Sequence, residues 1–206
     1  MSTPLQFVPT PPPEEVARAN FYGLLARLFY APPDAALLRT LAAADELEAE
    51  GLQADEQGLA LAWRGLSKAA ADADPEAVRE EYEAAFIGVG KAPITLYTSA
   101  YSMRYTNEAP LAQLRGELSK LGLARRSESS EPEDHIAALF EVMRHLIAEQ
   151  RRGLEEQKRF FERWIWPVVE PLCDAINKSE LTPHYRPVAK FTRAFLELEH
   201  CAFEML

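Results

Sequence analysis

Residues 130–147 read SEPEDHIAALFEVMRHLI, and this stretch shows how the chain is built. Ser130 and Glu133 fit a capping box at a helix start, with Pro132 in the first turn. Apolar residues then recur at steps of three and four, the spacing of one buried helix face. These residues are Ile136, Leu139, Phe140, Met143, Leu146 and Ile147. The stretch therefore predicts a helix that starts near Glu131 and packs against a core.

The same helical spacing recurs on both sides of this stretch, with proline or glycine at the breaks. Glu14 and Glu15 suit the start of a first helix, because acidic side chains favour the positive end of the helix dipole. The other helices are predicted over about 34–50, 55–72, 75–86 and 110–121, and from Gly153 onward with a kink at Pro167. A last helix after Pro183 carries a buried seam at heptad spacing on Val188, Phe191, Phe195, Leu198, Ala202 and Met205.

The pattern gives eight or nine helices and no convincing strand. We therefore expect an all-α protein, with a single compact bundle-like domain over residues 14–206 and a flexible arm over residues 1–13. The composition agrees, because Ala, Leu and Glu dominate and 48% of the residues are hydrophobic, enough for a core.

The charge and the termini narrow the class of protein. A formal net charge of −10 argues against nucleic-acid binding, which needs a basic surface. Cys173 and Cys201 form no CxxC pair, as expected in a reducing compartment. The first residues lack the pattern of a secretory signal, and no apolar run approaches the roughly 18 residues that span a bilayer. We expect a cytoplasmic protein without stable membrane insertion.

One connection, over about residues 88–109, is longer than helix packing requires. Gly88-Val89-Gly90 predicts the end of the preceding helix, since glycine accepts the left-handed cap conformation. Tyr97, Tyr101 and Tyr105 follow at a spacing of four, which allows a short helix and argues against disorder. We expect this connection to be functional.

No pattern for catalysis or a cofactor stands out. Gly88-Val89-Gly90-Lys91 lacks the other residues of a phosphate loop, and no nucleophile lies in a triad context. Di-iron bundles use Glu-x-x-His twice, whereas Glu197 and His200 form the one occurrence here. We expect no enzyme activity and no cofactor. Two alternatives stay open: a helical metal or redox enzyme using Glu197 and His200, and a helical ligand-sensing regulator.

Asp134-His135 admits two interpretations. Acidic residues in a first helical turn stabilise the helix, and His135 could be a packed imidazole at the edge of the apolar stripe. Alternatively, the pair forms a polar rim beside an apolar groove. Such a site suits a peptide that carries a positive segment followed by hydrophobic residues.

Three motifs together resemble the TorD/DmsD/NarJ-type redox-enzyme maturation chaperones. They are Tyr82 and Phe86 before Gly88, the Pro93 loop that leads to Tyr97, and Glu131-Pro132-Glu133-Asp134-His135. The resemblance follows the helix order over about residues 16–203. It implies an all-helical cytoplasmic chaperone, monomeric or dimeric, that binds the twin-arginine signal peptide or another part of a molybdopterin oxidoreductase catalytic subunit. Such a chaperone holds the subunit until its cofactor is inserted, before export.

The resemblance also implies a peptide site formed by Tyr82, Phe86, Pro93, Tyr97, Asp134 and His135. The sequence departs from the family pattern at three positions: Ala85 replaces a common Leu, Val89 replaces a common Pro, and Ile94 replaces a frequent aromatic residue. The acidic net charge agrees with capture of a basic leader by electrostatic steering.

Overall fold

The computed structural model describes residues 11–47, 54–88, 91–102, 110–124 and 131–206. These residues form ten α-helices and one π-helical turn, so the all-α prediction is confirmed and the predicted count of eight or nine was slightly low. The elements are α1 Pro13–Tyr30, α2 Ala35–Ala42, α3 Ala54–Asp72, α4 Pro75–Tyr82, the π turn Glu83–Ile87, α5 Ser99–Ser102, α6 Pro110–Lys120, α7 Ile136–Ala148, α8 Leu154–Trp164, α9 Trp166–Lys178 and α10 Tyr185–Glu204.

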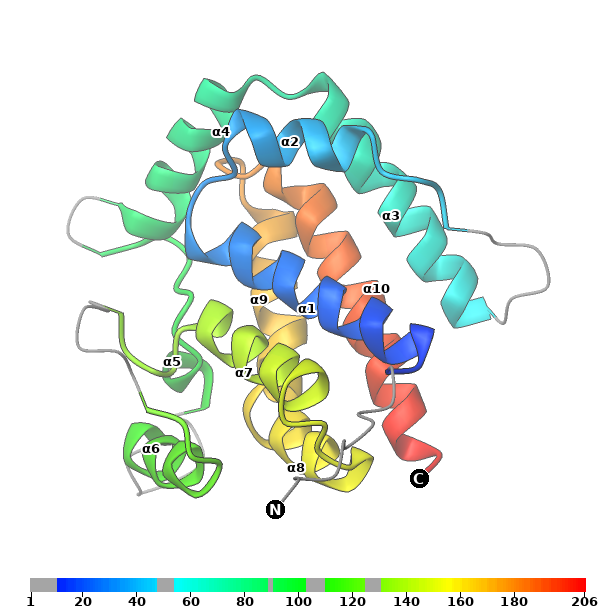
Figure 1. Ribbon diagram of the computed structural model, residues 1–206. Helices are drawn as coiled ribbons and strands as arrows, with labels where there is room; N and C mark the ends of the chain where they lie inside the picture. The colour runs from blue at the N-terminus through cyan, green and yellow to red at the C-terminus, as the bar shows by residue number, and fades with distance from the viewer. Residues whose placement is uncertain (1–10, 48–53, 89–90, 103–109, 125–130) are drawn as a thin grey trace, which may run out of the picture.

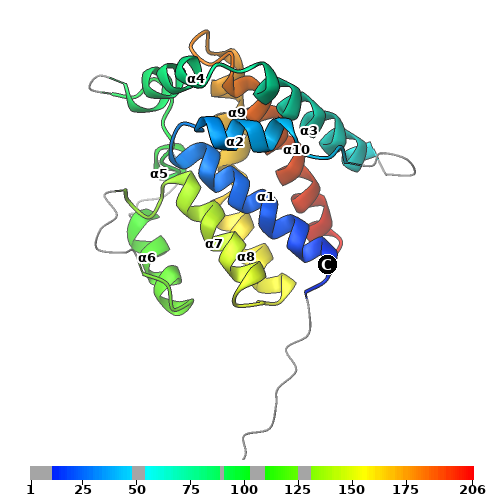
Figure 2. The same ribbon diagram turned by 45° about the horizontal axis from the view of Figure 1, so that its top comes forward.

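Helices α1 and α7 lie side by side at the centre of the fold (Figures 1 and 2). Helix α10 packs against both α3 and α9, and α2 packs on α3. Aromatic rings fill the space between these helices. Phe29 contacts Phe140 across α1 and α7, and Tyr22 contacts Phe195 across α1 and α10. Burial of such large rings is the main favourable contribution to folding.

A buried polar network joins α1 to α10 inside this core. Arg18 donates from Nε and Nη2 to the two carboxylate oxygens of Glu199, at 2.6 and 2.8 Å. Its Nη2 also donates to Gln157 Oε1 at 2.9 Å, and the Tyr22 hydroxyl donates to Glu199 Oε2 at 3.0 Å. Because Glu199 is only 4% exposed, its charge is compensated inside the protein by Arg18 rather than by water.

The start of α10 is capped by a side chain from α4. The buried carboxylate of Glu81 accepts the backbone N–H groups of His184 and Tyr185, at 2.9 and 2.8 Å, and lies 2.7 Å from His184 Nδ1. N–H groups in the first turn of a helix have no partner within the helix, so this carboxylate satisfies them.

Helix α2 is shorter than its predicted range of 34–50. Asp34 caps it, accepting the Leu37 N–H at 2.7 Å, but the helix ends at Ala42. The carbonyl of Asp45 instead accepts Trp63 Nε1–H from α3 at 2.9 Å, so residues 43–47 follow α3 in a non-helical path. Residues 48–50 lie outside the described part of the chain.

The predicted start of α7 near Glu131 was wrong. The helix begins at Ile136, and His135 is its N-cap, with Nδ1 accepting the Ala137 N–H at 3.2 Å. Backbone pairing with residues 96–98 holds His135 extended, and this tertiary contact outweighs the local helix signal. The apolar stripe itself is confirmed, because all six of its residues are buried.

The predicted seam of α10 is correct in its first half only. Val188, Phe191 and Phe195 are buried, but Leu198 is half-buried, and Ala202 and Met205 are exposed. Glu199 and Phe203 face the core instead. A straight helix has 3.6 residues per turn, so its buried face drifts away from a heptad repeat within a few turns.

Gly88 ends the π turn, as predicted for the glycine pair. Its φ is +63°, and its N–H donates to Glu83 O at 2.7 Å. A Cβ there would lie 3.0 Å from the carbonyl oxygen of Lys91 and 3.1 Å from Pro93 Cδ, so a side chain would be both strained and crowded. Val89 and Gly90 lie outside the described residues.

Other predicted elements have mixed outcomes. The short helix at Tyr101 is present as α5, and the kink predicted at Pro167 is a break at Ile165 between α8 and α9. Residues 1–10 of the arm predicted over 1–13, the segment 103–109 with Tyr105, and residues 125–130 lie outside the described part of the chain. None of the described helices has an apolar stretch that could cross a membrane.

Candidate functional site

Two short extended segments meet beside the start of α7. The Thr98 N–H donates to Asp134 O at 2.9 Å, and the Ile136 N–H donates to Leu96 O at 2.8 Å. Tyr97 and His135 thereby form an isolated antiparallel β-bridge. The structure thus brings together three of the residues predicted for the site, Tyr97, Asp134 and His135.

Tyr97 lies at the surface of this junction and is 37% exposed. Its hydroxyl donates to Glu131 Oε2 at 2.6 Å, and its ring stands edge-on to His135 at a centroid distance of 5.4 Å. The hydrogen bond to Glu131, together with partial burial, raises the pKa of Tyr97 to about 12. Tyr97 therefore stays neutral and keeps its proton for donation.

Asp134 and His135 are buried, with 5% and 6% exposure. One carboxylate oxygen of Asp134 accepts the Ser99 N–H at 3.3 Å at the start of α5. Burial lowers the pKa of His135, and the nearby carboxylates of Glu131 and Asp134 oppose that shift. Through these contacts Asp134 and His135 fix the connection to α7 and support the surface around Tyr97.

The pKa of His135 predicts how stability depends on pH. Because the folded state binds the His135 proton less well than the unfolded state, stability should fall as pH drops through the unfolded pKa near 6.5. His135→Asn keeps an N-cap acceptor but cannot titrate there. Urea denaturation from about pH 7.5 to about pH 5.5 should show a smaller loss of stability for the variant than for wild type. An equal loss of stability in wild type and His135→Asn over this pH range would show that His135 is not the source of the pH dependence.

Tyr82 and Phe86 lie in the core just below the junction. Tyr82 donates its hydroxyl to Phe29 O at 2.9 Å, and Phe86 meets Tyr185 edge-on at 5.0 Å. Burial raises the pKa of Tyr82, and the nearby Glu131 and Tyr97 raise it further, so Tyr82 is close to the junction without reaching the surface. Pro93 is exposed and packs against Gly88.

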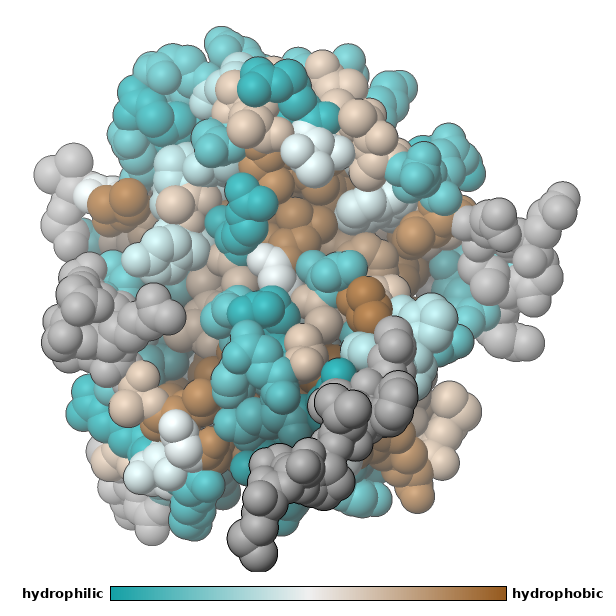
Figure 3. Space-filling model, in the orientation of Figure 1, coloured by the Kyte–Doolittle hydropathy of each residue, from teal (hydrophilic) through white to brown (hydrophobic). Residues whose placement is uncertain are grey.

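A groove of about 590 Å³ opens next to His135, between α1, α6 and α7. Figure 3 shows hydrophobic surface in the furrow between α6 and α7, flanked by hydrophilic surface. The apolar residues that line the groove include Ala26, Leu118, Leu123, Ala137, Ala138 and Val142.

The polar lining of the groove is predominantly acidic. Four glutamates, Glu131, Glu133, Glu141 and Glu149, line it together with Arg27 and Arg144. Arg144 donates to Glu141 at 2.6 Å and to Glu149 at 3.2 Å, and Arg115 from outside the groove pairs with Glu133 at 3.0 Å. The groove thus combines an apolar floor with a hydrogen-bonded carboxylate rim.

Sequence reasoning missed most of this groove. Ala138, Glu141, Val142 and His145 lie on the face of α7 next to its buried stripe. Their steps of three and four carried the signal for a second helix face. The opposite wall of the groove, which includes Tyr30 on α1, could be assigned only once the fold was known.

Glu197 does not belong to the group of potential metal ligands that contains His200. Glu197 is exposed, whereas a ligand atom of His200 lies within 4.8 Å of ligand atoms of Glu162 and Glu204. The alternative that used Glu197 and His200 therefore shares only its histidine with this group of side chains.

The fold and the sequence together define the family. The family model described as nitrate reductase delta subunit matches residues 52–174, and the chain belongs to this family. The chaperone protein TorD of Photobacterium profundum is 32% identical over 76 residues, which are 36% of this chain. That match spans 35% of the length of TorD.

A solved structure from Archaeoglobus fulgidus, described as a redox enzyme maturation protein, shares the fold. It superposes with a TM-score of 0.55 over 95% of this chain and 99% of its own, at 21% identity. These comparisons confirm the resemblance to TorD-like proteins that the three sequence motifs suggested.

Proposed function

We propose that this protein is a redox-enzyme maturation chaperone that acts in the cytoplasm. It binds the twin-arginine signal peptide of a molybdopterin oxidoreductase catalytic subunit, and holds the subunit until its cofactor is inserted and before export. Membership of the nitrate reductase delta subunit family and the partial match to TorD support the chaperone role. The proposed activity is binding and not catalysis.

The observation that carries the peptide assignment is the composition of the groove beside His135. A twin-arginine leader presents a basic segment followed by a short apolar one. The glutamate rim suits the arginines, because guanidinium groups form strong paired hydrogen bonds with carboxylates. The apolar floor formed by α1, α6 and α7 suits the hydrophobic segment.

Each predicted site residue has a definite place in this proposal. Tyr97 contributes an exposed edge at the junction, and Asp134 and His135 fix that junction from below. Tyr82 and Phe86 support it from the core, and Pro93 shapes the connection that leads to it.

Titration of a fluorescent twin-arginine leader peptide tests the assignment. Glu131→Gln keeps an acceptor for Tyr97 but removes one rim charge, and should weaken binding by about threefold to tenfold. Val142→Thr places a hydroxyl on the apolar floor at constant shape, and should also weaken binding. Glu180→Gln removes an exposed charge from the α9–α10 connection and should leave binding unchanged.

Two results would contradict this proposal. Unchanged peptide affinity in both groove variants would exclude the groove as the leader site. Binding of the catalytic subunit that persists equally without its leader would show that the chaperone recognises another part of its client.

A further inference from the structure

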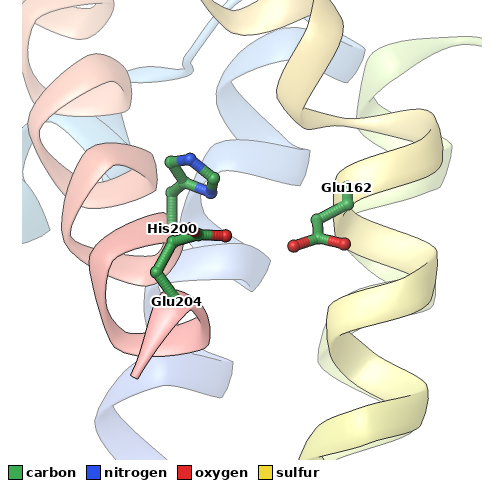
Figure 4. A group of neighbouring side chains, drawn as sticks. All are labelled: Glu162, His200 and Glu204. Carbon is green, nitrogen blue, oxygen red and sulfur yellow. The ribbon is translucent and has the colours of Figure 1, made fainter. Parts of the chain in front are cut away.

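A second group of potential ligand side chains lies between α8 and the last turns of α10. It comprises Glu162 on α8, with His200 and Glu204 one turn apart on α10. One ligand atom from each residue lies within 4.8 Å of the other two. Figure 4 shows the α10 pair projecting toward α8, where Glu162 faces them. None of these three residues lines the groove beside His135.

The imidazole of His200 is held in place by aromatic stacking. Its ring lies 4.0 Å from that of Trp166, with 26° between the planes, and it also stacks on Phe161. Its Nδ1 is buried and has no hydrogen-bond partner among the described residues. A buried imidazole nitrogen without a partner is costly, and coordination of a cation would remove that cost.

The ammonium group of Lys158 forms a long ion pair with Glu162. Lys158 Nζ is 3.8 Å from Glu162 Oε1, beyond hydrogen-bond distance, and it donates instead to the carbonyl oxygen of Phe203 at 2.7 Å. The two glutamates attract cations, while the lysine is directed to the end of α10. Glu162 and His200 are half-buried and Glu204 is exposed, so solvent reaches the cluster.

We propose that Glu162, His200 and Glu204 bind one divalent transition-metal ion, with Zn²⁺ the best match, and that this ion joins α8 to the end of α10. One imidazole and two carboxylates suit Zn²⁺, whereas Mg²⁺ and Ca²⁺ prefer oxygen ligands alone. Bonds of about 2.0–2.2 Å place neighbouring ligand atoms roughly 3.0–3.5 Å apart. Rotation of the flexible glutamate side chains closes the remaining gap, and water completes the coordination.

Calorimetric titration of chelator-treated, untagged full chain with ZnCl₂ tests this proposal. The wild type should bind one equivalent, and the ion should raise the midpoint of thermal unfolding. Glu162→Gln is isosteric, and His200→Phe keeps the stacking on Trp166. Each should weaken binding at least about tenfold, the scale on which metal sites respond to changes around them.

Two further variants serve as matched controls. Glu197→Gln removes an exposed carboxylate three residues from His200, and Cys201→Ser removes an exposed thiol next to it. Both should bind the ion as wild type does. Absence of saturable binding, unchanged affinity in Glu162→Gln and His200→Phe, or loss of binding in Cys201→Ser would overturn the proposal.

Discussion

Arg18→Ala is expected to lower the free energy of unfolding by about 3–5 kcal/mol, the largest effect of any single substitution considered for this chain. The substitution leaves the Glu199 carboxylate buried without its guanidinium, and removes three hydrogen bonds of Arg18 to Glu199 and Gln157. The cost arises mainly from the uncompensated charge, since Glu199 is almost inaccessible to water. Urea denaturation followed by far-ultraviolet circular dichroism measures the change.

Two variants separate this explanation from a general effect of losing arginine. Arg27→Ala, on the exposed face of the same helix, should cost no more than about 0.5 kcal/mol. The double variant Arg18→Met/Glu199→Gln buries no charge and should recover a clear part of the loss. A cost below about 1 kcal/mol for Arg18→Ala would show that the network contributes little net stability.

Glu81→Ala is expected to cost about 2–4 kcal/mol, because it leaves the backbone N–H groups of His184 and Tyr185 without their acceptor. The Tyr185 N–H is buried, so water cannot easily replace the carboxylate. Glu81→Gln retains one carbonyl acceptor and should fall between wild type and Glu81→Ala. The same urea denaturation measures all three proteins.

The neighbouring residue provides the control for this prediction. Glu80 is also a glutamate on α4, but it is exposed, so Glu80→Ala should change stability by no more than about 0.5 kcal/mol. If Glu80→Ala and Glu81→Ala behaved alike, the cap on α10 would not be the source of the effect.

Local sequence patterns were sufficient to predict most of the helices. The apolar stripe of α7 was predicted residue by residue, because steps of three and four report directly which face is buried. The helix end at Gly88, which is set by local chemistry, was also predicted correctly. The family resemblance rested on the same kind of local motif.

Features set by distant parts of the chain could not be predicted in this way. The start of α7 depends on pairing between His135 and Tyr97, and the end of α2 depends on Trp63. Most of the residues that line the groove were missed for the same reason, since its walls come from α1, α6 and α7. Asp134 and His135 were predicted in the first turn of a helix, but their burial depends on a β-bridge that helical periodicity does not reveal.

The link between Arg18 and Glu199 has a consequence for synthesis on the ribosome. These residues are 181 positions apart, so α1 leaves the exit tunnel long before the partner of its buried arginine exists. Until α10 emerges, the contacts of α1 with Phe195 and Glu199 cannot form. The core therefore closes only late in translation, because it depends on contacts of high sequence separation.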